Sequence, residues 1–419
     1  MKQKKYTYLL LLLLSLFSIP LYAQEDVEEN ANEDQESFAD SLRQLKDSTL
    51  LWPKSMQQGL NELLKNPIFQ RTQLGLLVYD LTADSVIYAH GERQQLRPAS
   101  CEKLLTAITA LWQLGGSFRF ETKLCYTGTL LEDSVLQGDL YLVGGFDPRF
   151  GSDDMKAFSE SLVRMGITRI DGHIYADLSM KDTLRLGKGW CWDDKSTRLT
   201  PLLYNGKDIF METLFRSLRE NGITTTETFS IARTPRDAKL IASRFHSLDQ
   251  ILMRMMKESD NLYAEAMFYQ LGAKRSGAYP SSKVSAQAVK DFIRAIGLNP
   301  SDYYIADGSG LSLYNYVTPE LLVTALRYAY ERNNIYLHLY PSLPIAGYDG
   351  TLEKRMRNGC AYENIYAKTG TVEGVSSLSG YATAANGHKL AFSIINQGIR
   401  HTNTGRRFQD RVCQMLTCP

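Results

Sequence analysis

Apolar residues recur along the chain in one pattern that is typical of helices and another that is typical of strands. Spacings of three and four residues predict helices at 56–64, 153–165, 208–219 and 404–416. Shorter apolar runs bounded by turn residues predict strands at 74–79, 85–88, 118–126, 136–143, 173–178, 376–381 and 390–395. The two kinds of element are interleaved, so we expect a mixed α and β fold.

One helix pattern carries candidate chemistry at its start. The apolar run 104–112 follows Arg97-Pro98 and ends at Gly115-Gly116, which predicts both a helix start and a helix stop. Ser100 and Lys103 lie three residues apart at the first turn and therefore share a face. Apolar surroundings lower the pKa of a lysine, and the neutral amine can then take the proton of a serine hydroxyl. The pair predicts a serine nucleophile with a lysine base, although the same spacing also occurs by chance on surface helices.

Two further motifs follow in order along the chain. A Ser-Asp-Asn stands at 259–261 and a Lys-Thr-Gly at 368–370. Together with Ser-x-x-Lys they form the signature of penicillin-binding proteins and related β-lactamases. Ser259 and Asn261 are suited to proton relay and to binding a substrate amide.

The Lys-Thr-Gly motif precedes strand-like residues, so we expect it on an edge strand. Lys368 and Thr369 would present a charge and a hydroxyl to a terminal carboxylate. Gly370 would remove a side chain where the substrate lies against the strand.

Composition and charge change this picture little, but the distribution of charge separates the N-terminal residues from the rest of the chain. With 47 Lys+Arg, 46 Asp+Glu and 44% hydrophobic residues, the 419 residues have an ordinary globular composition, which excludes a collagenous or mostly disordered protein. Residues 1–23 carry three lysines and residues 24–40 carry eight acids without a base, so the total of +1 leaves +6 for 41–419. That sign suits an anionic cell wall and would fit nucleic acid equally well. The three ordered motifs, together with the N-terminal export signal described next, favour the cell wall over nucleic acid as the partner.

The N-terminus predicts export. A basic start, an apolar core near a dozen residues and Leu21-Tyr22-Ala23 are typical of a cleaved signal peptide, 1–23. The alternative is a retained membrane anchor, for which the core is shorter than the roughly 20 residues of a spanning helix. Residues 24–48 are acidic and polar, and we expect a disordered linker there. The expected location is the periplasm.

Cysteine and histidine usage gives no support for a metal site. The six histidines are scattered and no cysteine pair has C-x-x-C spacing, so we expect no metal and no other cofactor. Cys413 and Cys418 are close enough in sequence to pair, and an oxidising compartment permits it.

With these motifs the chain resembles the D-alanyl-D-alanine carboxypeptidases of the penicillin-binding protein 4 type, peptidase family S13. The resemblance runs from about Leu74 to Gly398, and its further matching segments are 138–148, 170–172, 306–312, 343–352 and 375–381. It implies an α+β fold with a β-lactamase/transpeptidase-like core, an antiparallel sheet flanked by helices. It also implies backbone N–H groups of Ser100 and Thr371 as oxyanion donors. Leu313 stands where the family commonly has arginine, so we expect recognition of an anionic peptide end to differ.

The spacing of the motifs predicts the domain organisation. Ser100 and Ser259 are 159 residues apart, more than compact β-lactamases place between these motifs. We therefore expect a discontinuous catalytic domain, 49–116 and 244–419, interrupted by an inserted α/β domain, 117–243. The short stretch between Trp192 and Phe210 suggests that this insertion is reduced relative to the family.

The resemblance implies a penicillin-sensitive serine D-Ala-D-Ala carboxypeptidase, endopeptidase or both. Its substrates would be peptidoglycan stem peptides ending in D-Ala-D-Ala, and β-lactam antibiotics would be covalent inhibitors. Nucleic acid is not expected as a partner. Neither the oligomeric state nor the stem-peptide preference follows from the sequence.

Three alternatives compete with that function. A β-lactamase-related hydrolase would need rapid deacylation, and no Glu-x-x-Leu-Asn motif stands at a suitable distance. A catalytically silent cell-wall binding protein is disfavoured by the presence of both Ser100 and Lys103. An intracellular esterase of related fold would lack the export signal.

Overall fold

The computed structural model describes residues 52–194 and 198–418. The expected signal peptide, 1–23, and the whole acidic linker, 24–48, lie outside the described residues. The chain divides into two compact units, one up to Leu64 and one from Lys65 onward. The first contains helix α3 (Lys54–Leu63), which the apolar spacing predicted and which buries Met56 and Leu60. The second unit contains the candidate site.

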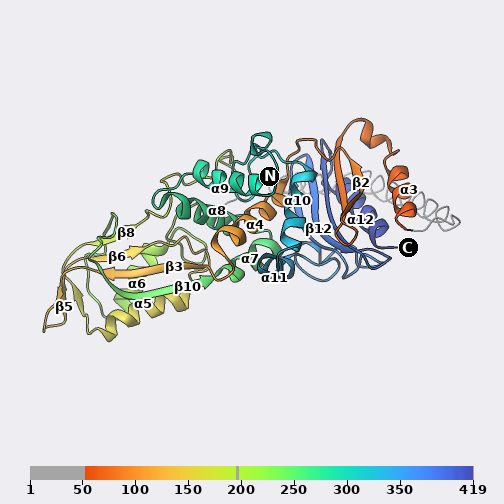
Figure 1. Ribbon diagram of the computed structural model, residues 1–419. Coiled ribbons are helices and arrows are strands. Elements are labelled where there is room, and N and C mark those ends of the chain that lie inside the picture. Colours follow the sequence, from red (N-terminus) through yellow and green to blue (C-terminus); the bar gives the residue numbers. More distant parts are fainter. Residues whose placement is uncertain (1–51, 195–197, 419) are drawn as a thin grey trace, which may run out of the picture. The chain divides into compact units, whose positions relative to one another are not determined.

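The first sheet of the second unit joins both ends of that unit. Its five antiparallel strands run in the order β11-β12-β13-β1-β2. The bounds are β1 (Gln73–Asp80), β2 (Ser85–His90), β11 (Tyr366–Val372), β12 (Val375–Thr383) and β13 (Lys389–Gln397). Figure 1 shows the orange β2 and the blue β12 in this one sheet. The last strands of the chain thus return onto the first hairpin, and β11 is an edge strand, as expected for the Lys-Thr-Gly motif.

Helices cover both faces of this sheet. On one face, Gln409 of α12 (Thr402–Thr417) donates to Ser376 Oγ at 3.0 Å and Asn396 Oδ1 at 3.2 Å. On the other, the Tyr381 hydroxyl donates to Leu326 O of α10 (Pro319–Tyr330) at 2.7 Å. Strand side chains alternate between faces, so Ser376 and Tyr381 point to opposite layers. The predicted α+β fold, an antiparallel sheet flanked by helices, is confirmed.

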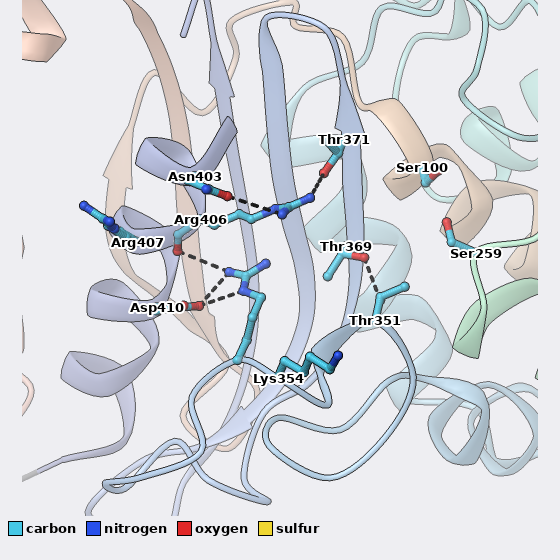
Figure 2. A pocket seen from close by; sticks show the side chains of 11 residues that line it. Ser100, Ser259, Thr351, Lys354, Thr369, Thr371, Asn403, Arg406, Arg407 and Asp410 are labelled. Carbon is cyan, nitrogen blue, oxygen red and sulfur yellow. Dashed lines mark hydrogen bonds and ion pairs between the residues drawn. The ribbon is translucent and has the colours of Figure 1, made fainter. Parts of the chain in front are cut away.

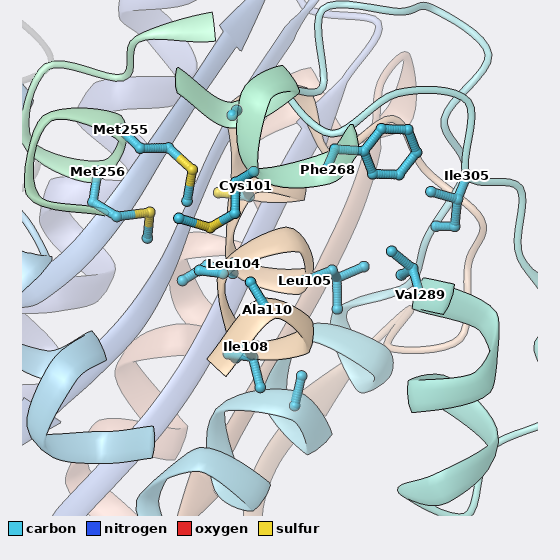
Figure 3. Close-up of a cluster of buried hydrophobic side chains, with 14 of the residues drawn as sticks. Cys101, Leu104, Leu105, Ile108, Ala110, Met255, Met256, Phe268, Val289 and Ile305 are labelled. Atoms are coloured by element: carbon cyan, nitrogen blue, oxygen red, sulfur yellow. The ribbon is translucent and has the colours of Figure 1, made fainter. Parts of the chain in front are cut away.

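Helix α4 (Glu102–Leu114) lies at the centre of a helical layer. Every residue from Glu102 to Leu111 is buried, because neighbouring helices enclose α4 on several sides. These neighbours are α7 (Leu248–Lys257), α8 (Asn261–Ser276), α9 (Ser282–Ala295), α10 and α11 (Asn333–Ser342). Figure 3 shows Leu104, Leu105 and Ile108 of α4 among side chains of this layer. The start of α4 is thereby held in an apolar surrounding.

Residues 119–247 form a second group of strands with its own apolar core. A five-stranded sheet has the order β10-β3-β6-β8-β9, and a three-stranded sheet the order β4-β5-β7. The bounds are β3 (Arg119–Tyr126), β4 (Thr129–Leu130), β5 (Val135–Gln137), β6 (Leu140–Val143), β7 (Arg169–Ile170), β8 (Ile174–Asp177), β9 (Phe229–Ile231) and β10 (Lys239–Ser247). Helices α5 (Ser152–Arg164) and α6 (Phe210–Glu220) contribute to the same core.

Two details of this region differ from the sequence prediction. The single strand predicted at 136–143 is wrong: it breaks at Gly138, where a Cβ would lie 2.0 Å from Thr127 O. Its two halves, β5 and β6, belong to different sheets. The expected boundary between 243 and 244 falls inside β10, so the chain reaches the helical layer only at Leu248.

The sequence left a pairing of Cys413 with Cys418 open, and the structure does not contain that pair. Cys418 instead forms a disulfide with Cys360, 58 residues away, because Cys413 faces inward from α12 and is fully buried. Among the described residues, Cys101, Cys125, Cys191 and Cys413 are free.

The described residues contain neither a candidate membrane span nor a candidate metal centre. No helix in the part of the chain that the structure describes is both long and apolar enough to cross a membrane. Within the same residues, no group of three or more His, Cys, Asp or Glu side chains is arranged to hold a metal ion.

Candidate active site

Ser100 lies on a short 3-10 turn, η2 (Ala99–Cys101), directly before α4 and not within the α-helix itself. Ala99 has a φ of +46°, in the left-handed region that residues with a side chain rarely adopt. Gly310 packs against this turn so closely that a Cβ there would lie 1.8 Å from Ala99 O. The turn, half-exposed at Ser100, is therefore fixed by neighbouring backbone.

Lys103 brings the first two motifs together. Its Nζ donates to Ser100 Oγ at 3.0 Å, to Asn261 Oδ1 at 2.7 Å and to the Ser309 carbonyl at 2.8 Å. All three hydrogen-bonding positions of the ammonium are thus used, and the side chain is fully buried. The predicted Ser100–Lys103 contact is present, and Asn261 holds the lysine.

Burial lowers the pKa of Lys103 to about 8, while the charges of Asp307, Glu265 and Asp260 oppose that shift. The buried Asp307 is well supplied with donors, including Trp190 Nε1 at 2.7 Å and Asn315 Nδ2 at 2.7 Å. The neutral amine required of a base is therefore accessible near pH 8.

Two further buried carboxyl groups stand near Lys103. Burial raises the pKa of Glu265 to about 8, although it accepts the Gly308 N–H at 3.0 Å. Burial also raises the pKa of Glu102 well above its usual range, and its carboxylate oxygens have no hydrogen-bond partner among the described residues. Sequence reasoning did not assign a role to these two residues or to Asp307.

Ser259 occupies the turn between α7 and α8 and has a φ of +59°. The turn is held by Asp260, whose carboxylate accepts the N–H groups of Leu262 at 3.0 Å and Tyr263 at 3.4 Å and so caps α8. Lys368 Nζ donates to Ser259 Oγ at 2.9 Å.

Lys368 of β11 is fully buried, and burial followed by the charge of Lys103 lowers its pKa well below the usual range. Its amine also donates to Thr369 O at 2.8 Å. The sequence interpretation directed this amine toward a substrate carboxylate. In the structure it lies against Ser259 and thus forms a second serine–lysine pair beside the first.

The remaining residues of the third motif divide between the two sides of β11. Gly370 faces the nucleophile: a Cβ there would lie 2.8 Å from Pro98 O and 2.9 Å from Ser100 N. The missing side chain makes room for the turn of Ser100, a role that the sequence interpretation did not anticipate. Thr369 and Thr371 point to the other side, and Thr369 Oγ1 donates to Thr351 Oγ1 at 2.7 Å.

A cleft of about 610 Å³ contains Ser100 and Ser259 together with the two threonines. Figure 2 shows Thr369 and Thr371 on the strand between these serines and the residues of α12. The other lining residues, none of which the sequence analysis assigned to the site, are Thr351, Lys354, Arg355, Asn403, Arg406, Arg407 and Asp410. Leu313 is not among the residues that line this cleft.

The arrangement is suited to acyl transfer by a serine nucleophile. Three distant parts of the chain supply its groups. These are the Ser100 hydroxyl with the desolvated Lys103, the Ser259 hydroxyl with Lys368, and the backbone N–H groups beside them. Thiol chemistry has no comparable support, because Cys101 is fully buried with its Sγ 3.2 Å from Lys368 O and a pKa raised by burial.

Comparisons with known proteins identify the family of the chain. The family model described as D-Ala-D-Ala carboxypeptidase 3 (S13) matches residues 56–203 and 197–417. D-alanyl-D-alanine carboxypeptidase DacB of Haemophilus influenzae is 24% identical over 77% of this chain and 84% of its own length. The D-alanyl-D-alanine carboxypeptidase of Actinomadura sp. strain R39 is 26% identical over 82% of this chain and 81% of its own.

The fold is shared with a solved structure. The crystal structure of penicillin-binding protein 4 from Haemophilus influenzae superimposes with a TM-score of 0.77 at 23% identity, over 85% of this chain and 97% of that one. The family that the motifs suggested is thereby confirmed. The chain belongs to the D-Ala-D-Ala carboxypeptidase 3 (S13) family of peptidases.

Proposed function

We propose that the protein is a penicillin-sensitive serine hydrolase that removes the terminal D-alanine from peptidoglycan stem peptides, or cuts the cross-links between them. The single observation that carries this function is the 3.0 Å hydrogen bond between Ser100 Oγ and a fully buried Lys103 whose pKa is lowered to about 8. Family membership supports the substrate class.

In the acylation step, neutral Lys103 takes the proton of Ser100, whose oxygen attacks the carbonyl of the penultimate D-Ala. The oxyanion is held by the N–H groups of Ser100 and Thr371. Asn261 exchanges its bond to Lys103 for one to the substrate amide, and Thr369 meets the terminal carboxylate.

Collapse of the tetrahedral intermediate breaks the peptide bond. Ser259 gives its proton to the departing amine and recovers one from Lys103, which took the proton of Ser100, with Lys368 as the donor to Ser259 Oγ on that route. Water then attacks the ester of Ser100, Lys103 again acts as base, and the serine and the shortened peptide are released. Each proton taken from a nucleophile is returned to a leaving group.

The partners follow from the same chemistry. β-Lactams present an amide carbonyl and a nearby carboxylate, so they acylate Ser100 and are released slowly. The penicillin-binding protein 4 of Haemophilus influenzae is known in complex with a β-lactam, which supports this inhibitor class. A β-lactamase is less well supported, because family membership favours the peptidases. Action on the cell wall places the protein in the periplasm after removal of residues 1–23.

We also propose a domain division that modifies the expected one. The strands of 119–247 and their separate apolar core form the inserted domain, and 65–118 with 248–418 form the catalytic domain. The Ser-Asp-Asn turn follows α7, the first helix after the insertion, so the insertion leaves the three motifs together.

The test is digestion of purified peptidoglycan, followed by separation of the muropeptides and assay of free D-alanine. The wild-type protein should release D-alanine from pentapeptides and form an adduct with benzylpenicillin on the peptide that contains Ser100. Ser100→Ala should do neither, and Ser393→Ala, at a buried serine of β13 outside the cleft, is the matched control. Product formation by Ser100→Ala at the wild-type rate would refute the assignment.

A further inference from the structure

One wall of the cleft carries more positive charge than the removal of a single D-alanine requires. Four cationic side chains line the cleft, Lys354, Arg355, Arg406 and Arg407, against one carboxylate, Asp410. The formal charge of the lining is therefore +3, without counting the buried Lys368 behind it. A terminal D-alanine offers one negative charge.

The single carboxylate of the wall is already used. Arg355 donates to Asp410 Oδ1 from Nε at 3.0 Å and from Nη2 at 2.6 Å. Lys354, Arg406 and Arg407 form no ion pair with any residue that the structure describes. Three of the four cations that line the cleft are therefore outside any ion pair among the described residues, although the charge of Arg406 also acts on Asp410.

Arg406 is held next to the reacting strand. Its Nη2 donates to Thr371 Oγ1 at 3.4 Å and its Nη1 to Asn403 Oδ1 at 3.4 Å. Both contacts are long and have uncharged acceptors, so a carboxylate can replace them at little cost. Figure 2 shows Arg406 directed toward Thr371, Lys354 extending on the side of the Thr351–Thr369 pair, and Arg407 farther out.

The position of Ser259 identifies which part of a substrate meets this wall. In the proposed mechanism Ser259 protonates the leaving amine, so the leaving group lies on its side of Ser100. Thr369 is the residue expected to meet the carboxylate of that leaving group, and both residues line the cleft with the cations. The wall therefore faces the leaving group.

We propose that Lys354 and Arg406, with Arg407 at the rim, form a leaving-group subsite that selects acidic peptides carrying two or more carboxylates over free D-alanine. This inference rests on the proposed function and adds a substrate preference to it. The substrate class is a cross-linked stem peptide, in which the leaving amine belongs to a second stem with carboxylates of its own. The bonds broken and formed are those of the proposed mechanism.

Two purified muropeptides test the subsite: a cross-linked dimer, whose leaving group is an acidic peptide, and a pentapeptide monomer, whose leaving group is D-alanine. The kcat and KM of each are measured for the wild type and for Lys354→Gln/Arg406→Gln. Arg357→Gln, with the same change at an exposed arginine of the same segment that does not line the cleft, is the matched control. Thermal unfolding confirms that each variant is folded.

The double variant should lose about 30-fold in kcat/KM for the dimer, mainly through a higher KM, and less than about fivefold for the pentapeptide. Arg357→Gln should change neither, and Lys354→Arg/Arg406→Lys should restore much of the preference. An equal loss for both substrates, or none for the dimer, would overturn the subsite. Failure of the proposed function would look different: the wild type would then cleave neither substrate and would not be acylated by benzylpenicillin.

Discussion

The cleft has two regions in which basic side chains differ in burial. We call the region of the two serine–lysine pairs the floor, and the region of Lys354, Arg355, Arg406, Arg407 and Asp410 the wall. On the floor, Lys103 and Lys368 are fully buried, and each amine is hydrogen-bonded to a serine. On the wall, Lys354 and Arg407 are exposed and have no ion-pair partner among the described residues. Burial lowers the pKa of both floor lysines, so they can exchange protons, whereas the wall cations keep their charge and can only attract anions.

The difference shows what each region needs from its support. The floor depends on close packing, since the turn of Ser100 lies between Gly310 and Gly370, where no Cβ fits. The wall depends on polar and covalent ties between two segments, namely Arg355 with Asp410 and Cys360 with Cys418. Changes on the floor should therefore affect the rate of chemistry, and changes on the wall should affect substrate preference.

The largest effect is expected from removing the base of the floor. Lys103→Met keeps a long apolar chain in the buried site but cannot take the proton of Ser100. The acylation rate with benzylpenicillin should fall about 10²–10⁴-fold, the range that general-base catalysis spans. Stopped-flow measurement of the acyl-enzyme gives the rate. A loss below tenfold would contradict the role of Lys103 as the base that activates Ser100.

A smaller loss is expected from disturbing the packing of the floor. In Gly370→Ala the new Cβ would lie 2.9 Å from Ser100 N and 2.8 Å from Pro98 O, so backbone must move. We expect kcat to fall about 10–100-fold with KM less affected, because misplacing reacting groups acts on the chemical step. Steady-state kinetics on a pentapeptide test this. A change confined to KM would assign Gly370 to substrate binding, as the sequence first suggested.

A shift in pH dependence is expected from the carboxyl groups beneath the floor. Glu265 raises the pKa of Lys103, and Glu265→Gln removes that contribution while retaining an oxygen for the Gly308 N–H. The pKa of Lys103 should fall, so the rise of the acylation rate with pH should move to lower pH by less than about one unit. A shift in the opposite direction would show that Glu265 acts on the site in another way.

The smallest effect on chemistry is expected from loosening the wall. Cys360→Ser/Cys418→Ser opens a loop of 58 residues, which should lower the free energy of unfolding by about 2–4 kcal/mol. Benzylpenicillin acylation should change less than about threefold, since neither cysteine touches the floor. Denaturant unfolding and acylation kinetics on the same preparation give both values. A large loss of acylation with unchanged stability would contradict the separation of wall and floor.

The sequence predicted the floor far better than the wall. Short motifs, whose spacing reflects local geometry, contain Ser100, Lys103, Ser259 and Lys368. The apolar run after Lys103 indicates that this lysine is buried. Asp307 stands within the recognised segment 306–312 and Glu265 stands just after the Ser-Asp-Asn motif, but nothing local shows that they lie behind the lysine.

The wall had no comparable signal. Lys354 and Arg406 are about fifty residues apart; the sequence predicted no element at Lys354, and it placed Arg406 on the helix 404–416 without a role in the site. Only the packing of α12 against the sheet brings them to one cleft. The disulfide could not be assigned from the sequence for the same reason, since Cys413 is nearer to Cys418 in sequence but faces the core.

The most direct test of the central claim is the pH dependence of the rate at which benzylpenicillin acylates Ser100. Lys103 acts as base only when neutral, and burial lowers its pKa to about 8. The rate should rise about tenfold per pH unit below that value and become level above it, and Lys103→Met should remove the rise. A rate that is independent of pH between 6 and 9, or a rise that persists in Lys103→Met, would contradict the account.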